Sequence, residues 1–255
     1  QGTEASLALY YRLWAEKGIE AWDGPWWDAI DEFTGHIEAI LGAPRGTVVP
    51  FQNVTRAMAA VASCLSFDGP RNRVLLTDLE FTTSYPFWCR LESLGAEIVI
   101  VSSDDGIDVS AEKLIDAMDD RVLIVPTSHA FFRSGALQDL KAISDAAHEV
   151  GAWVLGDGYQ AVGNVPIDLV ELDVDFYVGG CHKWLCGGAG AGYLYVKERL
   201  IPVLEPRLTG WVGLADPFEY RAATSAGKYN QGVWRFLGGT PNVPALYAAR
   251  EGLKI

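Results

Sequence analysis

The chain has 255 residues, of which 49% are hydrophobic and 21% charged, and it contains 27 glycines and 12 prolines. This balance is that of a globular protein and excludes a disordered or fibrous chain. Lys and Arg number 20 against 33 Asp and Glu, which gives a formal net charge of −13. Such a charge argues against binding nucleic acid by neutralising its phosphates, so any anion site must be local.

The sequence contains no run of about 18 apolar residues and no basic, then apolar, N-terminal signal. We therefore expect a cytoplasmic protein without a membrane span. The four cysteines lack the tight pairing of a disulfide scaffold or a zinc site. Cys181 and Cys186 could be metal ligands, but no histidine or second cysteine pair completes a ligand set at the usual spacing. We expect buried thiols and no metal site.

The first clear element is a helix over residues 27–41. Its apolar residues, among them Phe33 and Ile37, recur at helical spacing, and Gly42 with Pro44 supplies the stop. Short β-rich runs follow at residues 47–51, 73–77, 97–101, 121–125, 152–156, 175–178 and 192–196. Amphipathic or alanine-rich stretches separate several of them, for example residues 55–65 and 137–150. This alternation predicts an α/β fold, a mostly parallel sheet with helices on both faces.

The C-terminal part of the chain is rich in glycine and proline, and residues 246–255 have the pattern of a helix that has neither cap nor breaker. We interpret residues 1–20 as an N-terminal segment and residues 21–240 as one large domain. Residues 241–255 are then expected to begin a small C-terminal domain that is largely absent from the chain.

Ligands of an open parallel sheet bind beyond the carboxyl ends of its strands, so the residues that follow each predicted strand are candidates. Asn53, Val54 and Thr55 follow the first strand and open an alanine-rich helix, whose free N–H groups favour an anion such as phosphate. Asn53 could equally be a helix cap that needs no ligand.

Two further strands are followed by groups of polar residues. Ser128 and His129 come after residues 121–125, and Asp157 and Gln160 come after residues 152–156. A single aspartate or histidine at a strand end is more often structural than catalytic. The joint occurrence of these residues favours a site.

Lys183 lies in a segment of apolar and glycine residues, residues 178–192. Desolvation disfavours the charged form of such a lysine, so its amine becomes nucleophilic and can form an imine with an aldehyde. The same segment fails as a dinucleotide-binding loop, because Tyr193 stands where the fingerprint that starts at Gly188 and Gly190 requires a third glycine. A nucleotide-dependent oxidoreductase is therefore disfavoured.

An imine-forming lysine, a strand-end acid and a helix-start anion site are what pyridoxal 5'-phosphate requires. The order of these motifs resembles the class V aminotransferase superfamily of fold-type I pyridoxal-phosphate enzymes. Residues 165–169, 210–213 and 235–241 are similar to kynureninases in particular, and the resemblance spans roughly residues 20–255. A cofactor-free interaction protein with this fold would be expected to have lost Lys183 or Asp157, and both are present.

The resemblance implies a role for each motif residue. Lys183 would bind the cofactor covalently, Asp157 would pair with its ring nitrogen, and Phe81 would stack on the ring. Ser128 and His129 would lie over or beside the ring, and His129 joins Lys183 and Asp157 as a candidate catalytic residue. The candidates for the phosphate are Asn53, Val54, Thr55, Gln160 and His182.

The resemblance also implies a homodimer with shared active sites, in which Trp211 and Thr240 reach the phosphate bound by the partner chain. Trp211 in its glycine-rich loop could equally be an ordinary packing residue.

Three features of the sequence depart from the kynureninase pattern. His182 replaces a tyrosine before the lysine, Tyr159-Gln160 replaces Ala-His, and Ser84 stands where an aspartate is expected. The first two are similar to cysteine desulfurases and epimerase-like relatives. We therefore expect an enzyme that acts on a small amino acid and cleaves a side-chain bond, by kynureninase-like hydrolysis or β-elimination at a C–S bond. The alternative is an aminotransferase or decarboxylating deaminase of the same superfamily. The carboxylate-binding arginine and any loop cysteine would lie beyond Ile255.

Overall fold

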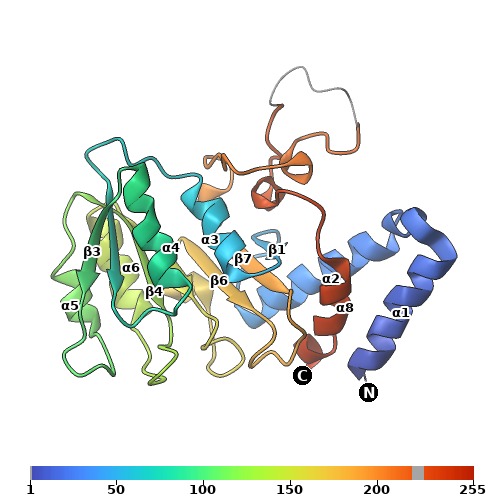
Figure 1. Ribbon diagram of the computed structural model, residues 1–255, viewed down its shortest axis with the longest axis horizontal. Helices are drawn as coiled ribbons and strands as arrows, with labels where there is room; N and C mark the ends of the chain where they lie inside the picture. The colour runs from blue at the N-terminus through green and yellow to red at the C-terminus, as the bar shows by residue number, and fades with distance from the viewer. Residues whose placement is uncertain (1, 220–226) are drawn as a thin grey trace.

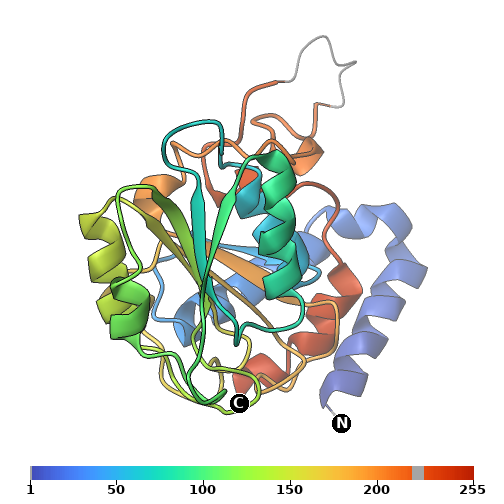
Figure 2. The same ribbon diagram turned by 60° about the vertical axis from the view of Figure 1, so that its left-hand side comes forward.

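The computed structural model describes residues 2–219 and 227–255, and within them the chain forms one seven-stranded sheet (Figures 1 and 2). The strands lie in the order β1-β7-β6-β5-β4-β2-β3. Their bounds are β1 Val48–Phe51, β2 Arg73–Thr77, β3 Glu97–Val101, β4 Val122–Ser128, β5 Trp153–Asp157, β6 Phe176–Gly180 and β7 Gly192–Val196. All the runs predicted to be strands are confirmed, and β4 extends to Ser128.

The sheet is mostly parallel, as predicted. Strands β3, β2, β4, β5 and β6 run in one direction, and β7 is antiparallel to both β6 and β1. The reversal at β7 arises because residues 181–191 join β6 to β7 as a loop, without the crossover helix that a parallel pair needs. Lys183 lies in this loop.

Helices cover both faces of the sheet. Their bounds are α1 Gly2–Lys17, α2 Pro25–Ile40, α3 Val54–Ala62, α4 Ser84–Cys89, α5 Ala111–Ile115, α6 Leu140–Glu149, α7 Leu169–Leu172 and α8 Val243–Ala249. Three of the predicted helices correspond to α2, α3 and α6, and the helix predicted over residues 246–255 is found as α8, which begins at Val243 and already ends at Ala249. The sequence did not predict α1, which buries only Ser6 and Tyr10 and so carries no apolar stripe.

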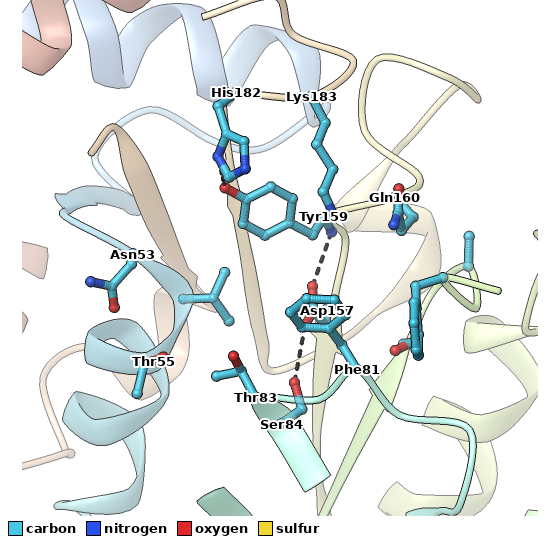
Figure 3. Close-up of a pocket in the computed structure, with 14 residues that line it drawn as sticks. Asn53, Thr55, Phe81, Thr83, Ser84, Asp157, Tyr159, Gln160, His182 and Lys183 are labelled. Atoms are coloured by element: carbon cyan, nitrogen blue, oxygen red, sulfur yellow. Dashed lines mark hydrogen bonds between the residues drawn. The ribbon is translucent and has the colours of Figure 1, made fainter. Parts of the chain in front are cut away.

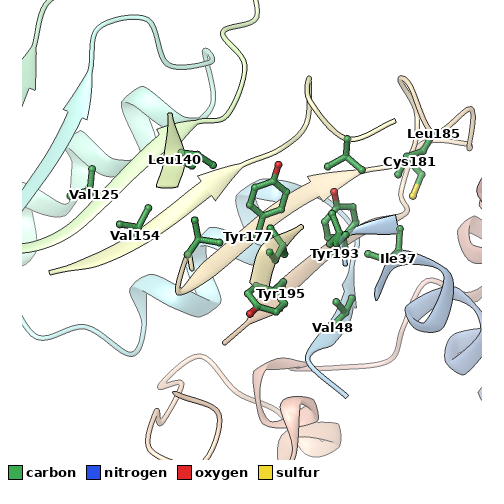
Figure 4. Close-up of a cluster of buried hydrophobic side chains, with 14 of the residues drawn as sticks. Ile37, Val48, Val125, Leu140, Val154, Tyr177, Cys181, Leu185, Tyr193 and Tyr195 are labelled. Atoms are coloured by element: carbon green, nitrogen blue, oxygen red, sulfur yellow. The ribbon is translucent and has the colours of Figure 1, made fainter. Parts of the chain in front are cut away.

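Each face of the sheet has its own apolar core. Residues of α3 and α4, such as Met58 and Trp88, pack on one face. Residues of α2 and α6, such as Ile37 and Leu140, pack on the other, where Figure 4 shows them with the tyrosines of β6 and β7. A sheet buried on both faces explains why its strands have nearly continuous apolar sequences.

The last residues of the chain pack against its first helix. Figures 1 and 2 show α8 beside α1, and the Ser6 hydroxyl donates a hydrogen bond to the carbonyl of Tyr247 at 2.7 Å. The Arg250 guanidinium pairs with Glu32 of α2 at 2.6 Å.

The predicted domain boundaries at residues 20 and 240 stay predictions. None of the helices among the described residues combines the length and apolar character of a membrane span.

Candidate active site

A cavity of about 200 Å³ lies where the carboxyl ends of β4, β5 and β6 meet the N-terminus of α3 (Figure 3). Ser128 is paired with Asp157, and Asp157 with Val178, in adjacent strands, so the sheet itself brings the strand ends together. The lining residues are Asn53, Val54, Thr55, Phe81, Thr83, Ser84, Ser128, Ala130, Phe132, Asp157, Tyr159, Gln160, His182 and Lys183. Most of the predicted cofactor residues thus share one cavity.

The Lys183 amine extends into this cavity between two aromatic rings. Its Nζ lies 4.5 Å from the ring centroid of Tyr159 and 5.1 Å from that of Phe81. Burial lowers the pKa of Lys183, and the charge of Asp157 opposes this shift. A lowered pKa increases the neutral, nucleophilic fraction of the amine near neutral pH, as the sequence predicted for this lysine.

Asp157 ends β5 and is buried beneath Lys183 (Figure 3). Its carboxylate accepts the backbone N–H of Tyr159 at 3.0 Å and the hydroxyl of Ser84 at 3.3 Å. Burial raises the pKa of Asp157, while these two hydrogen bonds and Lys183 act in the opposite direction. A buried carboxylate held this way would be stabilised by a positively charged N–H group inside the cavity.

The N-terminus of α3 opens onto the same cavity. The Asn53 side chain accepts the N–H of Arg56 at 3.0 Å, so Asn53 is a helix cap and also lines the cavity. The N–H groups of Val54 and Thr55 belong to the first turn and have no partner inside the helix. Gly192 allows this close approach, since a Cβ there would stand 3.3 Å from the Asn53 Cα. The first turn of α3 is therefore available to an anion.

Ser128 lines the cavity and is held by a buried acid that the sequence did not single out. Glu80 accepts both the backbone N–H of Ser128, at 2.9 Å, and its hydroxyl, at 2.6 Å. The Thr77 hydroxyl donates to the other carboxylate oxygen at 2.8 Å. Burial raises the pKa of Glu80 to about 7 despite these bonds.

His129 is not among the residues that line the cavity. Alternate residues of an extended chain point to opposite sides, and Ser128 and Ala130 are the ones that face the cavity. The His129 ring is buried instead against Tyr177, with Nδ1 2.7 Å from the phenol oxygen. Burial lowers the pKa of His129 to about 4, so the ring is neutral. The backbone N–H of His129 donates to the carbonyl of Asp157 at 2.9 Å, but the His129 side chain does not join Lys183 and Asp157 in the cavity.

The remaining lining residues include several that sequence reasoning missed. Thr83 follows β2, so a search beyond the carboxyl end of this strand would have found it, whereas Ser84 was noted in the sequence only as a departure from the kynureninase pattern. Gln160 accepts the indole N–H of Trp184 at 3.3 Å. The Phe132 ring meets Phe81 edge to face, with centroids 5.1 Å apart.

Trp211 and Thr240 lie away from Lys183, beside a separate groove of about 720 Å³ that Trp27 and Phe218 also line. The rings of Trp211 and Phe218 are 5.9 Å apart. Within this chain the two residues therefore contribute nothing to the cavity, and their predicted role across a dimer stays a prediction.

The sequence of residues 8–255 matches the family model described as Aminotransferase class-V. The chain belongs to this family. An uncharacterized aminotransferase of Bacillus subtilis is 30% identical over 96% of this chain and 63% of its own length. A cysteine desulfurase of Haloferax volcanii is 30% identical over 85% of the chain and 49% of its own length. A kynureninase of Bacillus anthracis is 29% identical over 97% of the chain and 61% of its own length. The chain thus spans about half to two thirds of these relatives.

Among solved structures, the complex of the cystine C–S lyase C-DES with its reaction product cysteine persulfide superposes with a TM-score of 0.86. The sequence identity is 22%, and the match covers 100% of this chain and 68% of the other. This likeness is one of fold. It confirms the predicted fold class, the α/β large domain of a fold-type I enzyme.

Proposed function

We propose that the protein is a pyridoxal-phosphate-dependent enzyme that acts on an amino acid and cleaves a side-chain bond. The main support for this cofactor is that three features it requires meet in one cavity. The Lys183 amine has a lowered pKa, Asp157 is a buried acid beside it, and the first turn of α3 offers free N–H groups.

The residues present fit this cofactor in charge. Its aldehyde suits a neutral amine, its ring nitrogen suits a buried carboxylate, and its phosphate suits a helix N-terminus. The chain is strongly acidic overall, and its net charge does not favour anions. The N–H groups at the start of α3 provide a local site where a phosphate can bind. The cavity also exceeds the roughly 150 Å³ that accepts a benzene ring in an engineered protein.

Bound pyridoxal phosphate supplies an electron sink for carbanion chemistry at the substrate α-carbon. The chain's own groups would direct that chemistry. Lys183 Nζ would accept and return protons at the α-carbon, and the Asp157 carboxylate would hold the proton at the ring nitrogen. Phe81 would cover the ring and keep water from it.

The choice of reaction rests on the relatives. A cysteine desulfurase and a kynureninase are among the similar proteins, and the cystine C–S lyase shares the fold. These names support cleavage of a side-chain bond, either at a C–S bond or by kynureninase-like hydrolysis. Because an uncharacterized aminotransferase is also among the similar proteins, transamination is the second candidate reaction.

A co-substrate requirement separates the two reactions. Side-chain cleavage is expected to proceed on L-cysteine, L-cystine or L-kynurenine without any added 2-oxo acid. Transamination would need a 2-oxo acid to return the amino group. Mass spectrometry of the products, with and without 2-oxoglutarate, distinguishes them, and turnover that depends strictly on the 2-oxo acid would overturn the cleavage assignment.

Trp211 and Thr240 support a homodimer with shared sites, because they border an aromatic groove on the surface of this chain and not its own cavity. Mixing Lys183→Ala chains with Trp211→Ala chains is expected to restore activity, since one site of each heterodimer then contains both native residues. The recovery should approach a quarter of the wild-type value at equal mixing, if each single variant is inactive and the chains pair at random. Absence of recovery despite verified chain exchange, or a fully active monomer in sedimentation, contradicts the shared site.

A further inference from the structure

Tyr159 contacts three polar residues that line the cavity, Asp157, Lys183 and His182. Its backbone N–H donates to Asp157 Oδ1 at 3.0 Å, and its ring lies 4.5 Å below the Lys183 amine. Its phenol oxygen is 2.5 Å from Nδ1 of His182, and Figure 3 shows the two side chains meeting end to end. Neither the predicted roles nor the proposed chemistry assigns a function to this tyrosine.

The backbone around Tyr159 leaves space for its phenol. Gly180 ends β6, and a Cβ at that position would stand 2.4 Å from the Tyr159 oxygen and 2.6 Å from the adjacent ring carbon. Any other residue at position 180 would displace the ring from His182. The contact between Tyr159 and His182 is therefore built into the end of the strand.

The protonation states of the pair decide the direction of its hydrogen bond. Burial, together with the nearby Cys181 and Asp157, raises the pKa of Tyr159 to about 12. The phenol therefore keeps its proton at neutral pH and is able to donate it to His182 Nδ1, the partner of its oxygen among the described residues. A neutral imidazole that accepts at Nδ1 has its own proton on Nε2.

We infer that Tyr159 is a positioning residue that fixes His182 in the tautomer with Nε2–H, so that this N–H can donate to the phosphate of a pyridoxal-type ligand. His182 lines the same cavity as Val54 and Thr55, whose backbone N–H groups form the anion site. The imidazole would thus add a directed donor to the N-terminus of α3. The inference rests on the proposed function only for the identity of the ligand.

The test uses Tyr159→Phe, which keeps the ring under Lys183 and removes only the hydroxyl. The variant is expected to bind pyridoxal 5'-phosphate about tenfold more weakly, in line with the loss of a donor to a charged group. Its affinity for pyridoxal, which lacks the phosphate, should stay within about twofold, because the ring and Lys183 are retained. Equal weakening for both ligands would overturn the inference. Tyr193→Phe is the matched control, because the buried Tyr193 hydroxyl has no hydrogen-bond partner among the described residues.

A double-mutant cycle shows whether the hydroxyl acts through the imidazole. In a His182→Ala background, Tyr159→Phe is expected to cause no further loss of affinity for pyridoxal 5'-phosphate. A full additional tenfold loss in that background would mean that the hydroxyl acts on the ligand by another route, and would reject the positioning role.

Nitrogen NMR of the ligand-free protein gives a readout independent of cofactor and activity. The ¹⁵N shifts of His182 are expected to report a proton on Nε2 in the wild type and a mixture of tautomers in Tyr159→Phe. An unchanged tautomer in the variant overturns the inference even if the cofactor binds. If the wild type fails to bind pyridoxal 5'-phosphate while the tautomer changes as expected, the proposed function fails and the coupling of Tyr159 to His182 stands.

Discussion

A Lys183→Ala variant is expected to lose the absorbance near the visible edge that a lysine imine of pyridoxal phosphate gives to the wild-type protein. The Lys183 amine is the nucleophile in the cavity, with its pKa lowered by burial. Turnover should fall by about 10²–10⁴-fold or more, because the same amine is the proposed acid and base at the α-carbon. The measurements are an absorbance spectrum after dialysis and mass spectrometry after borohydride reduction.

Lys141→Ala is the matched control for this experiment. Lys141 lies on the exposed side of α6 and pairs with Asp145, an exposed i,i+4 contact that contributes little to stability. Its removal should leave both spectrum and turnover unchanged. A borohydride-reducible adduct that persists in Lys183→Ala would assign the covalent link to another lysine.

The sheet was predictable from the sequence because burial on both faces leaves a simple pattern. In runs such as residues 121–125, four of the five residues are apolar, and turn residues bound them. Short helices lack such a signal. Helix α5 spans Ala111–Ile115 and buries only Leu114, and α4 includes Pro86, so neither shows a full helical stripe.

A search of the residues beyond the carboxyl ends of the strands located most of the site, but the contacts between its side chains depend on the fold. Glu80 and Ser128 are 48 positions apart, and Tyr159 and His182 are 23 apart. No local sequence pattern indicates such pairs. They become neighbours only because of the order of the strands in the sheet. The orientation of His129 had a local signal, since it follows Ser128 in an extended chain and must point the other way.

An Asp157→Asn variant is expected to keep the cofactor and lose most of its turnover. Asparagine matches the shape of the buried aspartate and can still accept the N–H of Tyr159, so the strand end should hold its conformation. The neutral amide cannot stabilise a proton on the ring nitrogen as a carboxylate does, and the electron sink is weakened. We expect affinity for pyridoxal 5'-phosphate to change by less than about tenfold and turnover to fall by about 10²–10⁴-fold.

Asp168→Asn separates this effect from a general loss of carboxylates. Asp168 caps α7 by accepting the N–H groups of Val170 and Glu171 at 2.9 and 3.1 Å, and asparagine caps helices equally well. That variant should match the wild type in cofactor binding and turnover. Full activity in Asp157→Asn would instead make Asp157 a structural strand-end residue, and would require a different acid to face the ring nitrogen. Adding Glu80→Gln to Asp157→Asn then tests Glu80, a second buried acid near these strand ends whose pKa the charge of Asp157 helps to raise.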